Sequence, residues 1–528
     1  MAEKPLTPEE IAILSPYVTN VDKPIFALKN LPEEVVAVLF AYYSRSKETL
    51  RRNLLKLLQE KDVDLEERTP TLSLPPGGEG KGEEELKEAK AKARQFHEKW
   101  VVGYGHASVA EHAVVHLAIE DVSIITTKII EDMRLAAYTE KSTRYVIFEE
   151  DKFYCPPVLL RSPYASLYRE TAHFLLKTYV SLFPQVIEHV KAEYPRKPDQ
   201  SERAYDSACR AKACDILRYI IPAGTLTNLG MTINGRALEH LLTKLFSHPL
   251  EEAREIAQLM KEEALKIIPT LIKYADYNAY MAETDQAMRQ VAGEIFPSPT
   301  SPLSKGEGAG GGRPAESRPV ILVRYPEDAE EQLVAAILYG YTNRPMTQVL
   351  ETARKLNQEE RERIIDEYLR RRGPHDQPLR ALEHLYYTFD ILVDYGAFRD
   401  IHRHRMATQT RQDLTIDHGY ETPEELVRYG LKETFDRSME RAAEAYAQIA
   451  KDFPLEAQYI VPLAYRIRVL FTWNLRELHH FIQLRSGRQG HISYRRIAQQ
   501  VFKELERVHP LLARYIRVDL SEYELGRL

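Results

Sequence analysis

The sequence predicts an α/β fold that is organised as two homologous modules. Short apolar runs with the β-branched and aromatic residues of buried strands alternate with longer stretches of helical periodicity. The order of these runs recurs in the second half of the chain, together with several charged residues. With 528 residues, of which 44% are hydrophobic and 28% charged, the chain has ordinary globular composition and enough length for two or more domains.

The clearest linker signal lies between the two modules. Residues 297–317 are rich in Gly, Pro and Ser and have no apolar residues that could pack into a core. Such composition is typical of a linker. The sequence therefore predicts an N-terminal module over residues 1–296 and a C-terminal module over residues 318–528.

The first module is predicted to contain mainly helices around two short strands. A Gly/Pro-rich break at residues 75–82 indicates a surface loop. The strand-like runs are residues 113–120 and 225–233. The predicted helices cover residues 32–60, 122–137, 163–192, 202–221 and 251–280, and a further helix follows Asn234-Gly235-Arg236.

The second module has an arginine-rich segment directly after its clearest strand. Residues 386–393 have the aromatic and β-branched content of a buried strand. Apolar positions then recur every four residues from Val393 to Arg405, which predicts a helix. On such a helix Arg399 and Arg403 share a face, and a helix with several guanidinium groups can contact anionic ligands or a neighbouring subunit.

The internal repeat is visible as matched residue pairs that follow one another in the same order. The pairs are Glu111-His112 with Glu383-His384 at an offset of 272, Arg134 with Arg405 at 271, and Asn234-Gly235-Arg236 with Asn474-Leu475-Arg476 at 240. Each pair stands in a similar strand or helix context, and the offset changes only where loops differ in length. The sequence therefore predicts a tandem duplication.

Bulk properties exclude several classes of function. The net charge of −6 leaves no global basic field for nucleic acid. No run approaches the ~20 apolar residues that span a bilayer, and the N-terminus has no apolar signal region. We therefore expect a cytoplasmic protein that binds neither nucleic acid nor a membrane.

The cysteines and histidines indicate neither disulfides nor a metal. Cys155, Cys209 and Cys214 all lie in the first half, without the spacing of a disulfide framework or a zinc site. Cys209 and Cys214 are expected to be core thiols. His402 and His404 would diverge on a helix, so no metal site is predicted there.

The arginine-rich segment resembles the signature of the flavin-dependent thymidylate synthases, RHRxxSxNxxSxRY. The second module keeps the beginning of that signature as Arg403-His404-Arg405. It has Asp413 and Thr415 where the family has Ser and Arg in the tail of the signature.

The first module has lost the other part of the signature. It keeps the tail as Ser142 and Arg144-Tyr145, but it has Asp132-Met133-Arg134 at the beginning. The chain is therefore similar to two flavin-dependent thymidylate synthase (ThyX-like) modules in tandem, with complementary losses.

Further features support the resemblance. The family has a His before a Glu-His pair, and His106 precedes Glu111-His112 in this way. The family also has a Leu-Arg pair after its Asn-x-Arg turn, and Leu484-Arg485 matches it, whereas the first module has Thr243-Lys244. The neighbouring Arg495-Arg496 pair is assigned to solvent.

The resemblance implies a twisted sheet flanked by helices in each module and an enzyme of nucleotide biosynthesis. The family is a class of flavoprotein methyltransferases that convert dUMP to dTMP by reductive methylation. Methylenetetrahydrofolate donates the carbon, and NADPH reduces FAD. Family members are usually homotetramers with sites between subunits, so the tandem chain is expected to form a homodimer that imitates this tetramer, a pseudo-tetrameric assembly.

The resemblance also assigns roles to individual residues. The residues expected to be catalytic are Ser142 and Arg144. The residues expected to bind the flavin are Arg403, His404, Arg405 and Arg485. The residues expected to bind the nucleotide are Arg144, Arg236 and Arg476. Planar guanidinium groups suit this purpose, because they bind phosphate in a bidentate way.

Two alternatives remain open on the residues alone. Asp413 would repel a phosphate where the family has a small hydroxyl, which favours a flavin-dependent methyltransferase acting on another uridine-containing substrate. Because neither module carries a whole signature, a non-catalytic nucleotide-binding or scaffold protein is the other alternative.

Overall fold

The computed structural model describes residues 6–43, 49–59, 107–296 and 318–521. The chain forms two compact units, each assembled from several stretches of sequence. Unit 1 comprises residues 1–120, 129–140 and 228–298, and unit 2 comprises residues 121–128, 141–227 and 299–528. The predicted linker at 297–317, the predicted loop at 75–82 and His106 lie outside the described residues.

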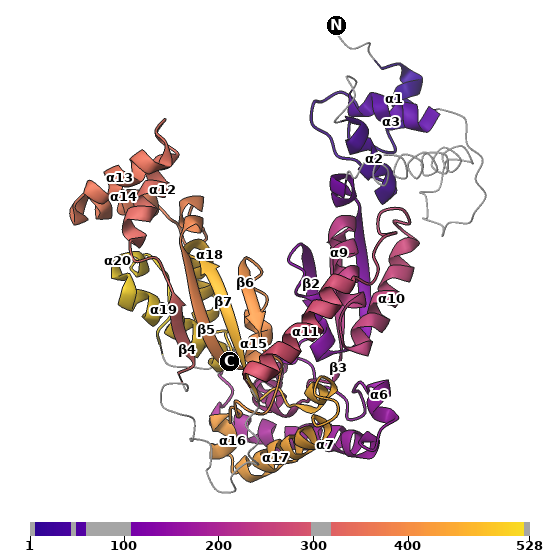
Figure 1. Cartoon of the computed structure of the whole chain (residues 1–528), viewed down its shortest axis with the longest axis vertical. Helices are drawn as coiled ribbons and strands as arrows, with labels where there is room; N and C mark the ends of the chain where they lie inside the picture. The colour runs from indigo at the N-terminus through magenta and orange to yellow at the C-terminus, as the bar shows by residue number, and fades with distance from the viewer. Residues whose placement is uncertain (1–5, 44–48, 60–106, 297–317, 522–528) are drawn as a thin grey trace. The chain divides into compact units, whose positions relative to one another are not determined.

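Unit 1 is built on a three-stranded sheet with the order β1-β3-β2 (Figure 1). Its strands are β1 (Val114–Ser123), β2 (Ala136–Glu140) and β3 (Leu226–Asn234). Its described helices are α1 (Pro8–Leu14), α2 (Glu33–Tyr43), α3 (Leu50–Gln59), the 3-10 helix η2 (Ala107–His112), α9 (Gly235–Phe246), α10 (Glu251–Leu265) and α11 (Ala279–Ile295). The strand β3 leads directly into α9, because the Asn234 side chain caps the helix by accepting a hydrogen bond from the Ala237 amide at 2.8 Å.

Unit 2 contains a four-stranded antiparallel sheet with the order β4-β5-β7-β6. Its strands are β4 (Val320–Arg324), β5 (Tyr386–Asp394), β6 (Ala407–Arg411) and β7 (Arg466–Asn474). Helices α18 and α19 lie along this sheet in Figure 1. The described helices are α6 (Pro157–Leu160), α7 (Ala165–Glu193), α8 (Glu202–Leu217), η3 (Arg218–Ile220), α12 (Ala329–Tyr339), α13 (Met346–Lys355), α14 (Gln358–Leu369), η4 (Arg380–His384), α15 (Tyr395–Ile401), α16 (Glu424–Arg428), α17 (Lys432–Ile449), η5 (Glu456–Ile460), α18 (Leu475–Ser486), α19 (Ile492–Val508) and α20 (Pro510–Ala513).

Aromatic stacking fixes α18 on the sheet of unit 2. Trp473 on β7 is buried and stacks on Phe471, with ring centroids 4.6 Å apart, and on Phe481 of α18, with centroids 4.7 Å apart. Asn474 then caps α18 by accepting a hydrogen bond from the Glu477 amide at 2.8 Å. This packing sets the position of the polar side chains that α18 carries.

The strand pairing confirms the predicted duplication. The order β1-β3-β2 in unit 1 matches the order β5-β7-β6 in unit 2. Ala136 pairs with Ile233, and Ala407 pairs with Trp473, so corresponding residues are 271 positions apart in one strand and 240 positions apart in the other. The same offsets relate the matched pairs in the sequence. Both repeats therefore combine helices with a small sheet of one topology, in agreement with the predicted mixed class.

Within unit 2 the two repeats are joined through matching segments. Pro222 and Pro462, which are 240 positions apart, form an antiparallel bridge. The neighbouring backbone hydrogen bonds run from Ala223 to Val461, from Gly224 to Tyr459, from Leu463 to Ile221 and from Ala464 to Tyr219, over 2.7 to 3.1 Å. If 240 is added to the number of the residue from the first repeat and subtracted from that of the residue from the second, the first two bonds become the last two. The segments are thus related by a local two-fold exchange, as at an isologous dimer interface.

The predicted helix over residues 122–137 is wrong in its second half. The helix α5 (Ile124–Ile130) ends earlier, and residues 136–140 form β2 instead. Pairing with β3 over five residues decides this, because it satisfies backbone groups that a further helical turn would have bonded locally. The Tyr138 hydroxyl donates to the carbonyls of Ile130 and Met133 at 2.9 and 3.0 Å and fixes the turn between them.

The predicted helix over residues 251–280 is also interrupted. The helix α10 ends at Leu265, shortly before Pro269, which has no amide hydrogen to donate. The helix α11 then begins after Asn278, whose side chain accepts a hydrogen bond from the Met281 amide at 3.2 Å.

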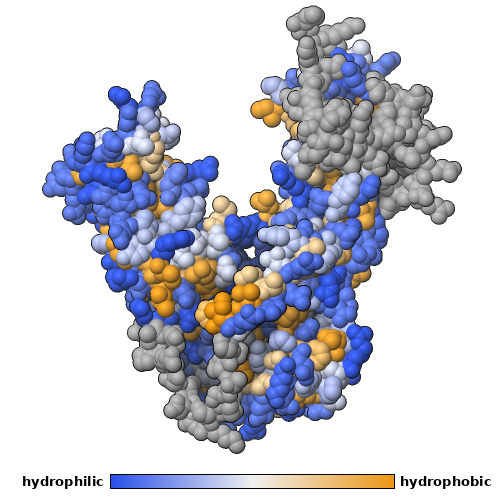
Figure 2. Space-filling view, in the orientation of Figure 1, coloured by the Kyte–Doolittle hydropathy of each residue, from blue (hydrophilic) through white to orange (hydrophobic). Residues whose placement is uncertain are grey.

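The helix α11 has an apolar face that no described residue buries. Met288, Val291 and Ile295 recur at helical spacing and are 56%, 40% and 63% exposed, and no residue of the helix is buried. Hydrophobic side chains appear on the surface at the C-terminal end of α11 in Figure 2. Among the described residues, no helix is long and apolar enough to cross a bilayer.

The core contains the cysteines that were expected there. Cys209 and Cys214 are buried in α8, as predicted, and Cys155 is half-buried. Burial raises the pKa of the Cys214 thiol to about 12, so this group stays protonated at neutral pH.

The two-fold bridge predicts a stability effect at Gly224. A Cβ atom there would lie 2.8 Å from the Tyr459 carbonyl oxygen and 2.9 Å from the Tyr168 hydroxyl. Because one of these is a backbone atom of the bridge, Gly224→Ala should lower the free energy of unfolding by about 1–3 kcal/mol. Gly340→Ala is the matched control in the same unit, because nothing lies within 4 Å of that Cβ position. Thermal or urea unfolding measures both variants, and equal stability of the two would contradict the prediction.

Candidate functional site

The signature tail of the first repeat forms a tight turn that carries Arg144. The Ser142 hydroxyl accepts a hydrogen bond from the Arg144 amide at 3.2 Å, a contact that the Ser-x-Arg spacing makes possible. The buried Arg144 guanidinium binds both carboxylate oxygens of Asp215 on α8, at 2.7 and 2.8 Å. Its Nη1 donates to the Tyr494 hydroxyl of α19 at 2.8 Å.

The pairing with Asp215 orients Arg144 without exhausting its donors. A guanidinium has five N–H groups, and Arg144 uses three of them in these bonds. Burial alone would lower the pKa of Arg144, but the hydrogen bonds and charge of Asp215 raise it above its ordinary value. Arg144 is therefore a fixed cation with N–H groups left for an anionic ligand.

A second chain of hydrogen bonds lies in the second repeat. The His404 Nδ1–H donates to the Glu477 carboxylate at 2.8 Å, and the Arg485 Nε–H donates to His404 Nε2 at 2.9 Å. These contacts define a neutral His404, protonated on Nδ1 only. Burial and the neighbouring Arg485 lower the pKa of His404 well below its ordinary value, in agreement with this assignment.

Asp400 connects the two chains of hydrogen bonds. Burial raises the pKa of this carboxyl, but four surrounding arginines lower it further than burial raises it. These arginines are Arg144, Arg218, Arg403 and Arg485. Arg218 is buried and donates to Asp400 at 3.4 Å, and its Nε and Nη2 have no hydrogen-bond partner among the described residues. The charges of these arginines exceed those of Asp215 and Asp400, so the group favours anions.

Tyr494 lies between two of these cations. Its ring centroid is 5.6 Å from the Arg144 Cζ and 5.3 Å from the Arg485 Cζ, within cation–π range. We call the residues that make these contacts the Arg144 network. They are Arg144, Asp215, Asp400, His404, Glu477, Arg485 and Tyr494.

The residues predicted to bind the flavin differ in exposure. Arg403 is exposed and makes no hydrogen bond to another described residue, and Arg405 is half-buried. The prediction that Arg403 lies on a helix is wrong, because α15 ends at Ile401 and the next residues form a turn before β6. Arg399, which was predicted to share its face, is buried and donates to Thr143 at 3.3 Å.

The two Asn-x-Arg arginines each form an ion pair within their own repeat. Arg476 donates to the Glu383 carboxylate and to the Pro378 carbonyl, both at 2.7 Å. Arg236 lies in unit 1, where it donates to Glu111 at 2.5 Å. Each arginine thus pairs with the Glu of its own Glu-His pair, and a phosphate would have to compete with that carboxylate. Their nucleotide-binding role stays a prediction.

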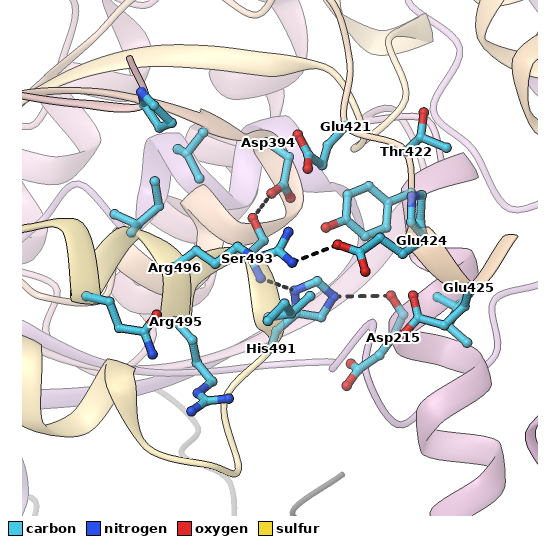
Figure 3. A pocket seen from close by; sticks show the side chains of 18 of the residues that line it. Asp215, Asp394, Glu421, Thr422, Glu424, Glu425, His491, Ser493, Arg495 and Arg496 are labelled. Carbon is cyan, nitrogen blue, oxygen red and sulfur yellow. Dashed lines mark hydrogen bonds and ion pairs between the residues drawn. The ribbon is translucent and has the colours of Figure 1, made fainter. Parts of the chain in front are cut away.

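A cavity of about 660 Å³ adjoins the Arg144 network in unit 2, with Asp215 in its wall (Figure 3). Most of its cations are neutralised by carboxylates. The pairs are Lys212 with Glu425 at 2.5 Å, Arg496 with Glu424 at 2.7 Å and Arg428 with Glu193 at 3.0 Å. A phosphate would have to displace these carboxylates, so the four arginines around Asp400 are better placed than the cavity to bind an anion. Among the described residues, no group of His, Cys, Asp or Glu is arranged to hold a metal ion.

The buried Asp394 carboxyl in the wall of the cavity has a shifted pKa. Asp394 caps α15 by accepting a hydrogen bond from the Ala397 amide at 2.7 Å, and it accepts another from the Ser493 hydroxyl. Burial raises the pKa of Asp394 to about 6, although the nearby Arg218 and Ser493 act in the opposite direction.

Several residues of the site were missed in the sequence. Asp215, Asp400 and Tyr494 had no predicted role. A comparison of the repeats could have marked Asp400, because Ile129 stands at the corresponding position. Arg495 was assigned to solvent, and this is wrong, since it is 1% exposed and donates to the Ser486 carbonyl at 2.8 Å. Its neighbour Arg496 is exposed, as predicted.

The family model that describes the thymidylate synthase complementing proteins matches the chain twice, over residues 60–270 and 321–511. The two matches correspond to the two repeats and cover more than half of the chain.

Several proteins of known sequence are similar to this chain. A UPF0159 protein of Chlamydia muridarum is 38% identical over 98% of this chain and 96% of its own length. A UPF0159 protein of Thermoplasma acidophilum is 31% identical over 83% of this chain and 91% of its own length. A flavin-dependent thymidylate synthase of Sulfurisphaera tokodaii is 33% identical over 26% of this chain and 56% of its own length.

Solved structures are also similar to part of the chain. The flavin-dependent thymidylate synthase ThyX of Helicobacter pylori, complexed with FAD and dUMP, matches with 19% identity and a TM-score of 0.30. The match covers 38% of this chain and 100% of that chain.

The raised pKa of Asp394 predicts a dependence of stability on pH. The folded protein keeps a proton that the unfolded chain has released above about pH 4, so folding becomes less favourable as the pH rises towards about 6. Asp394→Asn keeps the cap without ionising. As the pH rises from about 4 to 7, the free energy of unfolding of the variant should therefore increase relative to that of the unchanged protein, by up to about 3 kcal/mol.

Urea unfolding at a series of pH values measures this difference. Asp417→Asn, at an exposed position of the same unit, is the control and should change with pH by less than about 0.5 kcal/mol. A stability difference for Asp394→Asn that does not vary with pH would refute the prediction.

Proposed function

Because the chain belongs to the thymidylate synthase complementing protein family, with two copies in tandem, we propose that it is a flavin-dependent thymidylate synthase. In this reaction dUMP is methylated reductively to dTMP. Methylenetetrahydrofolate donates the carbon, and NADPH supplies the reducing equivalents to FAD. The relative that carries the name of this activity supports the proposal.

The meeting of the two signature halves is the observation that carries the proposal. Arg144 comes from the first repeat, and Arg403 and His404 come from the second, yet all three belong to unit 2. Arg144 and Arg403 both act on Asp400. One chain thus combines the two parts of a signature that neither repeat contains alone.

The donor set fits phosphate groups. Arg403 is exposed, and Arg144 keeps two N–H groups beyond its bonds to Asp215 and Tyr494. Arginines bind phosphate oxygens in a bidentate way, and fixed arginines do so with little loss of side-chain entropy. We assign the phosphates of FAD to Arg403, Arg405 and Arg485, and the phosphate of dUMP to Arg144, with Arg236 and Arg476 as further contacts.

The protein has to bind and orient its ligands, because bound FAD supplies the hydride chemistry. Asp215 holds Arg144 in one orientation, and Ser142 holds the turn that carries it. His404, which is kept neutral by burial, holds Arg485 through Nε2. Such fixed charges need little reorganisation when a ligand binds or reacts.

The local two-fold exchange supports an assembly of two chains. Residues 219–224 and 459–464 pair within one chain as two subunits pair in an isologous dimer. A single chain then stands in for a dimer of one-repeat subunits, and two chains stand in for the tetramer. We propose this pseudo-tetrameric homodimer as the active form.

The activity itself gives the first prediction. The purified chain should show flavin absorbance and should oxidise NADPH in a dUMP-dependent way. Arg144→Ala and Arg403→Ala should each lower kcat/KM by roughly 100-fold or more, because each removes charged hydrogen bonds to a phosphate. Arg437→Ala is the control, since Arg437 makes only an exposed ion pair with Glu433, and its activity should stay within about twofold.

Mixing the two variants tests whether the site lies within one chain. A mixture of Arg144→Ala and Arg403→Ala proteins should remain inactive, because both residues belong to unit 2. Recovery of activity would mean that different chains supply the two arginines. Flavin-loaded protein that does not bind dUMP would favour another uridine-containing substrate, and folded flavin-free protein would favour a scaffold.

The assembly is tested by the mass in solution. Sedimentation or light scattering should give twice the chain mass of 61.0 kDa. A mass of four chains would contradict the idea that each chain stands in for a dimer.

A further inference from the structure

We infer that each chain binds one FAD and one dUMP, not two of each, because only one of the two copies of the Arg144 network that the duplication supplied is intact. The inference rests on the proposed function and specifies how many sites of that kind a chain contains.

The strands, helices and bridge fix which residues correspond in the two repeats. The offset is 271 for α5 with α15 and for β2 with β6, and the alignment of the signature in the sequence extends it to Arg144 and Thr415. It is 240 for β3 with β7, for α9 with α18 and for Pro222 with Pro462. It is 241 for α10 with α19, whose N-caps are Leu250 and His491.

The Leu-Arg motif matches Arg485 with Lys244, but the alignment of α9 with α18 places Leu245 at that position. On the alignment of strands and helices, six network residues have uncharged counterparts. They are Thr415 for Arg144, Ile129 for Asp400, Met133 for His404, Ala237 for Glu477, Leu245 for Arg485 and Ala253 for Tyr494. With the exception of the Thr415 hydroxyl, these side chains have no hydrogen-bonding group beyond a weak thioether acceptor. The second copy cannot reproduce the bonds of the first, whatever its arrangement.

Residues that bond to each other in the intact network are replaced together in the other copy. The pair of Arg144 and Asp215 has lost its arginine, and the chain of Arg485, His404 and Glu477 has lost all three members. A buried charge is costly once its partner is gone, whereas an apolar replacement of both partners can be nearly neutral. The composition of the second copy is therefore the one expected if the residues of the network were lost together.

Structural features outside the network are kept in both repeats. Asn234 and Asn474 cap their helices through the same bond, at 2.8 Å in each. The ion pair between the Asn-x-Arg arginine and the Glu of the Glu-His pair is also present twice, as the bonds of Arg236 and Arg476 show. General divergence of one repeat does not explain why the bonded residues of the network are lost together while these caps and ion pairs are kept.

Binding stoichiometry tests the inference. Titration calorimetry of dUMP into the flavin-loaded full chain should give one site per chain, and flavin absorbance should give one FAD per chain. The double variant Arg144→Thr/Asp215→Leu removes both members of the intact ion pair, so it leaves no partner of that pair buried and unpaired, and it should fold. Its affinity for dUMP should fall by roughly 100-fold or more.

Thr415→Ala is the matched control, because it alters only the counterpart of Arg144. Its affinity and stoichiometry should equal those of the unchanged protein. Two dUMP per chain in the unchanged protein would overturn the inference and leave the proposed function intact. The same holds if the double variant still binds one dUMP per chain with unchanged affinity. Folded protein that binds neither FAD nor dUMP would overturn both.

Discussion

The antiparallel pairing of residues 219–224 with residues 459–464 is the constraint on which the rest of unit 2 depends. Each backbone hydrogen bond contributes only about 1 kcal/mol in net terms, but buried backbone groups left without partners would cost more. The pairing joins part of the first repeat to the second, and the close approach at Gly224 leaves no room for a side chain. Arg144 and His404 belong to the same compact unit for this reason.

The charges gathered there form a site that is prepared before a ligand arrives. Buried arginines are tolerated because carboxylates and a tyrosine hydroxyl accept their hydrogen bonds, and Arg144 illustrates this with Asp215 and Tyr494. The single charge of Asp400 does not neutralise the four arginines around it, so a net positive field remains in this buried region of low dielectric constant. Such a field favours phosphate. Burial, together with the charge of Arg485, lowers the pKa of His404 and keeps this imidazole neutral.

The sequence contained much of the fold and half of the site. The helix after Asn234 and the buried strand at 386–393 depend on local patterns, and they were predicted correctly. The ends of elements at Ile130 and Ile401 depend on pairing with distant strands, so periodicity extended both helices too far. Asp215 and Tyr494 stand 71 and 350 positions from Arg144, and no local pattern announces such a contact. The roles of the signature residues stay predictions.

Covalent connection of the two repeats changes how the site responds to dilution. Where separate chains supply the parts of a site, its integrity depends on their concentration, as for any bimolecular complex. Here the first repeat and the second are parts of one polypeptide, so their effective concentration is set by the connecting segments and not by the amount of protein. The bridge at Pro222 and Pro462 can therefore be short and made of few hydrogen bonds. Dilution of the protein therefore does not separate the repeat that supplies Arg144 from the repeat that supplies His404.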